Sequence, residues 1–159
     1  RLAMHASDRG LSEAIELRRA LEIYAVGLAA ENSTAAELDT LEATLSIMRA
    51  STDRYAEWVA ADVQFHMQLA EAGKNGLLSF LVQALRGTME ETIGLLHAQR
   101  RLRDPEATLR RHIDIFEAVS AHNPEAARRA MQLHFEATQP VVNAIVAARS
   151  AQPEPDATP

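Results

Sequence analysis

The sequence predicts an all-α fold, an antiparallel bundle of six or seven helices. Ala, Leu, Glu and Arg dominate the 159 residues and β-branched residues are sparse, which favours helix over strand. Apolar residues recur at intervals of three and four, and no stretch alternates convincingly as a strand would. Short polar turns with helix-capping residues separate the apolar stretches, as up-down packing of consecutive helices requires.

The first helix is expected over residues 11–31. Its apolar stripe has helical spacing and consists of Leu17, Leu21, Tyr24 and Leu28. The second is expected to end near residue 50. Thr34 and Glu37 at its start fit a capping box, in which each side chain accepts a backbone N–H of the other residue. Its inward residues are expected to be Leu38, Leu41, Leu45 and Met48.

The third helix is expected over residues 53–73, because Gly73 is a natural C-terminal stop. The turn Gly-Lys-Asn-Gly separates it from a fourth helix expected from residue 77 to residue 97. The expected inward residues of the fourth helix are Leu78, Leu81, Leu85, Ile93 and Leu96.

Two later helices are predicted to begin with the same capping pattern. Asp104 and Asn123 each precede a proline, so each places a capping side chain before a residue suited to the first helical position. They predict a fifth helix up to about residue 121 and a sixth after Asn123. Pro140 either kinks the sixth helix or opens a separate short helix that ends near residue 148.

Composition and charge exclude several classes of function. The net charge of −6 disfavours a chain that itself binds nucleic acid, because such a domain usually carries a basic face. The absence of cysteine excludes disulfides and thiolate chemistry. No apolar run approaches the roughly 20 residues of a membrane span and no signal peptide is visible, so we expect a cytoplasmic protein without membrane contact.

Polar residues on apolar helical faces are the main functional signal. Asp62 and His66 are four residues apart, so on a helix they share one face, which also carries Trp58, Phe65 and Leu69. A carboxylate and an imidazole on such a face are costly unless they bind each other, a buried water or a metal ion.

Two further histidines lie on predicted inward faces. His112 shares the stripe of the fifth helix with Leu109, Ile115 and Val119, and His134 follows Met131 on the sixth; the facing of His97 is ambiguous. A single inward histidine is usually a core residue bonded to a carbonyl or to water. Three helices that each bring a histidine inward, one with an aspartate, favour a first-row transition metal instead.

The predicted ligands are Asp62, His66, His112 and His134. Zinc suits either a closed four-ligand shell or one that is open to a further ligand. Nickel, manganese and iron are possible alternatives with six-coordinate shells. Enzyme signatures are missing: there is no His-Glu-x-x-His pair, no Glu-x-x-His pair, no glycine-rich phosphate loop and no nucleophile elbow.

Four stretches together resemble a known family. They are ELRRALEIYAVGLAAENSTAAELDTLE, DVQFHMQLAEAGKNGLL, RRHIDIFEAVSAHNPEAARRAMQLHFE with its paired histidines, and the leucine-rich stretch 77–96. The chain resembles the FCD domain, the C-terminal effector-binding domain of FadR-subfamily GntR transcription regulators. The resemblance covers residues 11–149, with residues 1–10 as a linker remnant and residues 150–159 as a disordered tail.

The resemblance implies a helical bundle around a central ligand cavity. In metal-binding members of the family, an aspartate and three histidines hold a divalent metal, and a small carboxylate effector sits on or near it. By motif these ligands fall on the same four residues. Arg18 matches the family's opening arginine and could pair with an effector carboxylate, or form a salt bridge with Glu22. Asn75 and Arg86 are further candidates for effector binding, although Asn75 also suits its turn.

The resemblance further implies a homodimer and an N-terminal winged helix-turn-helix that binds operator DNA. Nothing before Leu11 is expected to form that domain, which was either removed or never present. The leading hypothesis is therefore the ligand-sensing and dimerisation domain of a transcription regulator, not an enzyme. One alternative is a metalloenzyme that activates water and needs a base such as Glu71, Glu90 or Glu91. The other is a structural dimerisation module.

Overall fold

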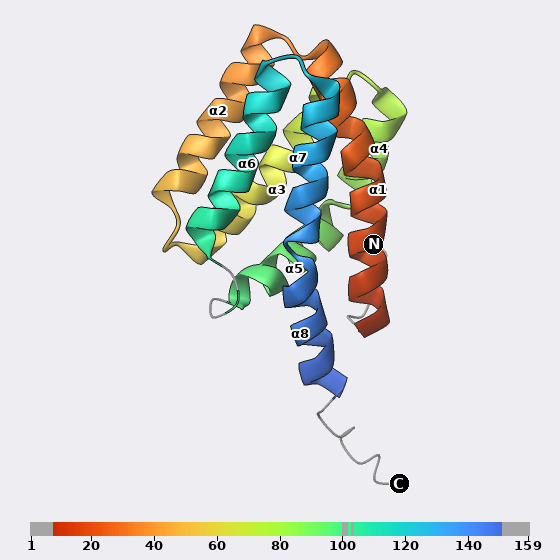
Figure 1. The fold of residues 1–159 in the computed structure, drawn as a ribbon, viewed down its shortest axis with the longest axis vertical. Coiled ribbons are helices and arrows are strands. Elements are labelled where there is room, and N and C mark those ends of the chain that lie inside the picture. The colour runs from red at the N-terminus through yellow and green to blue at the C-terminus, as the bar shows by residue number, and fades with distance from the viewer. Residues whose placement is uncertain (1–7, 100–101, 103, 151–159) are drawn as a thin grey trace, which may run out of the picture.

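The computed structural model describes residues 8–99, 102 and 104–150 (Figure 1). Within these residues every regular element is a helix, which confirms the all-α class, and no helix is long and apolar enough to cross a membrane. The predicted tail beyond residue 150 and the first seven residues lie outside the described residues. The helices are α1 (Asp8–Asn32), α2 (Ala35–Ala50), α3 (Tyr55–Ala72), α4 (Gly76–Ala84), α5 (Arg86–Ala98), α6 (Pro105–Ser120), α7 (Pro124–Glu136) and α8 (Gln139–Ser150).

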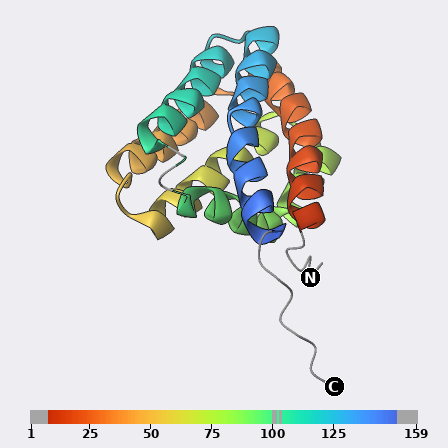
Figure 2. The same cartoon turned by 60° about the horizontal axis from the view of Figure 1, so that its bottom comes forward.

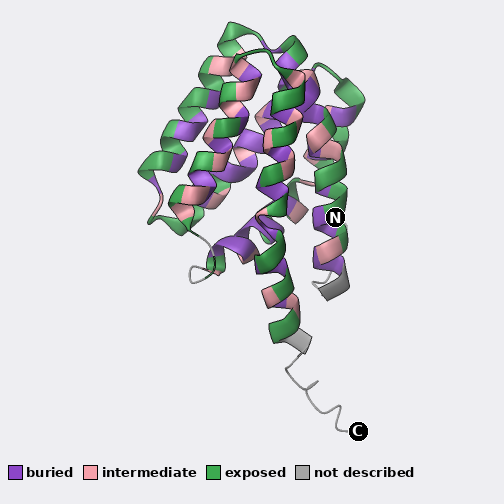
Figure 3. Ribbon diagram, viewed as in Figure 1, coloured by how far each residue is buried: buried purple, intermediate pink, exposed green. Residues whose placement is uncertain are grey.

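Helix α3 runs through the middle of the bundle. It packs against α1, α2, α4 and α5, while α7 packs between α1 and α6 on another side (Figures 1 and 2). More than half of the residues of α3 are buried (Figure 3). A polar side chain on this helix is therefore drawn into the interior unless it lies on the narrow exposed edge.

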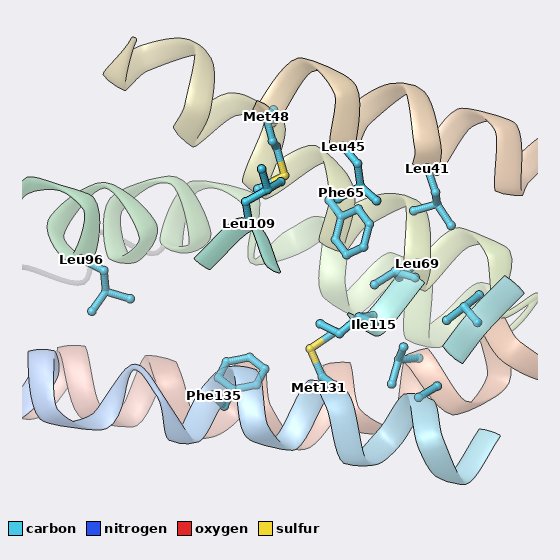
Figure 4. Close-up of a cluster of buried hydrophobic side chains, with 14 of the residues drawn as sticks. Leu41, Leu45, Met48, Phe65, Leu69, Leu96, Leu109, Ile115, Met131 and Phe135 are labelled. Atoms are coloured by element: carbon cyan, nitrogen blue, oxygen red, sulfur yellow. The ribbon is translucent and has the colours of Figure 1, made fainter. Parts of the chain in front are cut away.

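The main core joins α2, α3, α6 and α7. Figure 4 shows the aromatic ring of Phe65 on α3 beside Leu45 of α2, with the side chains of Ile115 and Met131 against each other nearer to α7. The labelled core residues are Leu41, Leu45, Met48, Phe65, Leu69, Leu96, Leu109, Ile115, Met131 and Phe135. The predicted inward face of the second helix is thus confirmed, since Leu41, Leu45 and Met48 are buried and Leu38 packs against them.

The predicted helix starts are confirmed by their hydrogen bonds. Thr34 and Glu37 form the capping box, with the Thr34 N–H donating to Glu37 Oε2 at 2.9 Å. Asp104 accepts from the N–H of Glu106 and Asn123 from that of Ala126, both at 3.0 Å. These side chains satisfy backbone donors that have no partner within the helix.

The predicted fourth helix is divided at Leu85 into α4 and α5. The N–H of Leu85 is shared between the carbonyls of Leu81 and Val82, at 3.3 and 3.0 Å, so the chain tightens there by one turn. The break turns Met89 and Ile93 of α5 inward. Leu81 of α4, which was predicted to face inward, is 43% exposed. The helical periodicity of one continuous helix therefore cannot predict the buried faces of both α4 and α5.

The predicted stripe of the first helix is wrong at Leu17 and Tyr24, whereas Leu21 and Leu28 are partly buried and pack against the core. Leu17 is 48% exposed and Tyr24 is 54% exposed, whereas Arg18 and Glu22 on the adjoining face are buried. The face that packs inward carries mainly small residues, among them Ala25 and Ala29. Counting apolar side chains displaced the predicted face, because it treats every charged residue, here Arg18 and Glu22, as solvent-facing.

Loss of the capping box should destabilise the domain measurably. Thr34→Ala removes the side-chain acceptor at the start of α2, and we expect the free energy of unfolding to fall by about 1 kcal/mol. Urea denaturation measures it. Thr40→Ala, at an exposed position within the same helix, is the control and should change stability by less than about 0.5 kcal/mol. Equal effects would contradict the role of the cap.

Candidate metal centre

The side chains of Asp62 and His66 lie on the inner face of α3. Each is 1% exposed, so both are removed from solvent. The Nε2 atom of His66 is 3.4 Å from Oδ1 of Asp62, one helical turn earlier. The predicted pair therefore forms, at the centre of the bundle rather than at its edge.

Helices α6 and α7 bring the other two predicted residues to this pair. The ring centroid of His112 is 5.4 Å from that of His66, and the ring of His134 is 5.1 Å from His66 and 4.6 Å from His112. His112 Nε2 lies 3.3 Å from Asp62 Oδ1. Helices α3, α6 and α7 thus bring three imidazoles together, and two of them lie within 3.4 Å of the Asp62 carboxylate.

The three histidines have the spacing of a metal-ligand set. One ring nitrogen from each of His66, His112 and His134 lies within 4.8 Å of the others. Nitrogen ligands at about 2.1 Å from one metal are roughly 3–4 Å apart, so small side-chain movements would close the set. Asp62 Oδ1 lies beside two of these rings and could supply a fourth donor.

The outer nitrogens of two rings are held by acceptors. His112 Nδ1 is 2.9 Å from the carbonyl of Thr108 and His66 Nδ1 is 2.6 Å from Oε2 of Glu22, so in each ring Nδ1–H can donate outward. Each Nε2 then offers its lone pair to the centre. This arrangement, in which a second layer fixes the tautomer, is typical of metal-bound histidine. Nε2 of His66 and Nε2 of His112 both lie beside the same atom, Oδ1 of Asp62, at 3.4 and 3.3 Å.

A buried ion pair supports His66 from behind. Nε of Arg18 donates to Glu22 Oε1 at 2.8 Å, and its Nη1 donates to the hydroxyl of Thr92 at 3.2 Å. The guanidinium also lies over the ring of Phe135, 5.5 Å from its centroid. Arg18 and Glu22 are each 3% exposed, so their charges are compensated mainly by each other and by His66.

The charges of this cluster shift three pKa values. Burial would raise the pKa of Glu22, but Arg18 and His66 outweigh it and lower that pKa from 4.5 to about 2. Burial would lower the pKa of His66, but the carboxylates of Glu22 and Asp62 raise it from 6.5 to about 9. Burial would raise the pKa of Asp62, but His112, His66 and His97 hold it well below its usual value. Without a metal, a proton on His66 therefore takes the place of a cation.

Sequence reasoning missed two members of the cluster. His97 is buried, and its Nε2 is 3.3 Å from Oδ2 of Asp62, the oxygen that faces away from His66 and His112. Its spacing of four and eight residues from Ile93 and Met89 could have identified its facing. Glu22 was considered only as a partner of Arg18, because nothing in the sequence indicates that it reaches His66.

The three residues predicted to bind an effector lie in three different places. The guanidinium of Arg18 is occupied by Glu22 and Thr92, next to the cluster. Asn75 is exposed and caps α4, where it accepts the N–H of Leu78 at 3.1 Å. Arg86 is exposed and lines an open groove over α2, α3 and α5 whose lining residues include none of the four predicted ligands.

A cavity of about 180 Å³ reaches the cluster from the side of α6, α7 and α8. His134 is the one predicted ligand among its lining residues, beside Thr108 and Arg111 of α6 and Val141 of α8. The three acidic residues considered as bases for a hydrolase, Glu71, Glu90 and Glu91, are exposed and do not line it. The cluster thus has an approach for a small molecule, and the carboxylate among the residues that line this approach, Asp104, caps α6 by accepting the N–H of Glu106.

A helical bundle with a buried histidine-rich centre and an adjoining cavity is an architecture suited to binding a small ligand. The family model of the FCD domain matches residues 13–137. The chain therefore belongs to the FCD domain family, the effector-binding domains of GntR-family transcription regulators. The prediction of this family from the sequence is confirmed.

Curated relatives are transcription repressors. The HTH-type transcriptional repressor NanR of Edwardsiella tarda (strain FL6-60) is 32% identical over 132 residues, which cover 79% of this chain and 48% of the relative. That of Citrobacter rodentium (strain ICC168) is 29% identical over 140 residues, covering 88% and 54%. The chain thus spans about half the length of the curated relatives it matches. They are named as repressors rather than enzymes, in agreement with the sequence prediction.

Solved structures show the same fold. Streptococcus agalactiae GntR superimposes with a TM-score of 0.71 at 25% identity, over 87% of this chain and 62% of the other. Escherichia coli McbR/YncC gives a TM-score of 0.72 at 18% identity, over 87% and 66%.

The buried arginine should matter more to stability than its exposed neighbour. Arg18→Met leaves the Glu22 carboxylate buried without its guanidinium, and we expect a loss of about 3 kcal/mol or more in the free energy of unfolding. Arg19→Met is the matched control, because Arg19 is 46% exposed and its nearest ion-pair partner, Glu136, is as far as 3.9 Å away. Its effect should stay within about 0.5 kcal/mol.

Both variants are measured by denaturant unfolding after treatment with a chelator, so that metal binding does not contribute. A loss at Arg18 no larger than that at Arg19 would contradict the structural role of the ion pair.

Proposed function

We propose that this chain is the metal-dependent sensing and dimerisation domain of a FadR-subfamily GntR regulator. Asp62, His66, His112 and His134 hold a divalent metal, with zinc preferred over nickel, manganese or iron. A small carboxylate effector binds at this centre and controls operator binding by a winged helix-turn-helix domain outside this chain. The observation that carries the proposal is the convergence of two Nε2 atoms on one buried carboxylate while acceptors hold both Nδ1 atoms.

The charge of the centre supports an anionic effector. Arg18, Glu22, Asp62 and a protonated His66 carry charges that cancel. A divalent metal replaces only one proton, because its ligands must be neutral imidazoles, and so leaves an excess of one positive charge in the interior. An uncompensated buried charge is costly, so a carboxylate that arrives through the cavity is favoured electrostatically.

Exposed apolar side chains support a homodimer. Helices α1 and α4 pack against each other. Together they expose five large apolar side chains, Leu17, Tyr24, Leu77, Phe80 and Leu81. Large exposed apolar side chains mark interaction sites, and soluble oligomers are mostly two-fold symmetric. We propose that a second copy of the domain covers this surface, which we call the α1–α4 face.

The two alternative functions have less support. A hydrolase needs a base beside the metal, and Glu71, Glu90 and Glu91 are on the surface. A purely structural module does not need a cavity that reaches His134. Neither alternative accounts for relatives that are transcription repressors.

Metal content tests the centre directly. We expect about one equivalent of a divalent transition metal in the gently purified domain, and its loss in His112→Ala and in His134→Ala, because each removes a ligand. Elemental analysis measures the metal, and circular dichroism checks that both variants remain helical.

His122→Asn is the matched control for metal content. His122 lies in a turn at a φ of 51°, which Asn tolerates, and its Nδ1 is 2.9 Å from the carbonyl of Ala30, so it takes no part in the centre. A parent domain that neither contains metal nor takes it up on titration would overturn the metal centre.

The oligomeric state tests the α1–α4 face. Phe80→Glu places a charge on it and should convert a dimer into a monomer in sedimentation velocity experiments, without loss of helical content. Ile47→Glu, at a comparably exposed apolar position on α2, should leave the dimer intact. Dissociation by both variants, or by neither, would contradict the proposed face.

A further inference from the structure

The two oxygens of Asp62 face different neighbours. Oδ1 lies 3.4 Å from Nε2 of His66 and 3.3 Å from Nε2 of His112, on the side of the candidate metal centre. Oδ2 lies 3.3 Å from Nε2 of His97, which α5 supplies. The carboxylate is thus held between two candidate ligands at one oxygen and a further histidine at the other.

The packing of His97 fixes the direction of its ring. His97 is 8% exposed, and its ring meets that of Trp58 edge to face, with the centroids 5.2 Å apart and the planes at 70°. Trp58 lies four residues before Asp62 on α3, so one face of α3 supplies both the indole and the carboxylate that His97 contacts. An imidazole held in this way can keep a carboxylate oxygen in one position.

His97 lies beside the centre rather than within it. Among the residues that the structure describes, the ring nitrogens within 4.8 Å of one another come from His66, His112 and His134. A metal-bound carboxylate only accepts hydrogen bonds, so Nε2 of His97 must carry a hydrogen in order to bind Oδ2 of Asp62. Because a ring nitrogen that carries a hydrogen has no lone pair for a metal, His97 does not act as a ligand through this atom.

We propose that His97 is a positioning residue that donates from Nε2 to Oδ2 of Asp62 and so leaves Oδ1 alone to coordinate the metal. The inference rests on the proposed function, because it assigns His97 a role toward the metal of that centre. Zinc can expand from four ligands to five, so a carboxylate restricted to one oxygen keeps a position open for the effector. Groups that orient a ligand in this way usually raise metal affinity roughly 10–100-fold.

Titration of the metal-free domain with Zn²⁺ against a chromophoric chelator tests the proposal. His97→Met fills similar space without an N–H donor and should bind Zn²⁺ roughly 10–100-fold more weakly than the parent. His97→Phe keeps a ring against Trp58, also lacks the donor, and should show the same loss. His97→Gln has nearly the size of the Met variant but places an amide N–H near the level of Nε2, so it should recover most of the affinity. Circular dichroism checks that the metal-free variants remain helical.

Tyr55→Phe is the matched control for the contact between α3 and α5. The hydroxyl of Tyr55 on α3 donates to the carbonyl of Gly94 on α5 at 2.7 Å, so its loss weakens the same helix pair at a different place, and Zn²⁺ should bind as in the parent. Parent-like affinity in folded His97→Met or His97→Phe, or an equal loss in His97→Gln or Tyr55→Phe, overturns the positioning role while the metal centre stands. A parent that takes up no Zn²⁺ overturns the metal centre and this inference together.

Discussion

The carboxylate of Asp62 is the constraint around which the interior is arranged. It is buried on α3, the central helix, and imidazoles from α3, α5 and α6 lie within 3.4 Å of its two oxygens. A buried carboxylate is tolerated only with compensating charge and hydrogen bonds. The surrounding helices can therefore pack in only those registers that keep the histidines beside it.

The compensation extends outward in layers. His66 lies between Asp62 and Glu22 and contacts both. Glu22 in turn accepts a hydrogen bond from Arg18, and Arg18 also donates to Thr92 on α5. Each step places an opposite charge or a donor next to a group that burial would otherwise neutralise. The apolar core of α2, α3, α6 and α7 supplies the bulk of the packing, while this chain of polar contacts fixes how α1, α3 and α5 meet.

The sequence revealed the inner part of this arrangement and not the outer part. Asp62, His66, His112 and His134 stand out because each interrupts an apolar stripe, and such an interruption needs a partner. Arg18 and Glu22 are four residues apart on a face of the first helix that the sequence suggests is exposed to solvent, where ion pairs of this spacing are common. Their burial depends on α7 and α5 covering that face, which local periodicity does not contain. The break at Leu85 is hidden for the same reason, since it reorients α5 to meet α3.

Helix α1 connects the proposed sensing centre with the proposed dimer surface. One of its faces carries Glu22, in contact with His66, and another carries Leu17 and Tyr24 of the α1–α4 face. An effector can change the behaviour of a dimer only through contacts that differ between two arrangements. A ligand bound at the proposed metal centre would displace α6 and α7, which carry His112 and His134, and α7 packs directly against α1. The buried contact between Glu22 of α1 and His66 of α3 joins α1 to the centre a second time, because a buried ion pair resists separation far more than an exposed one.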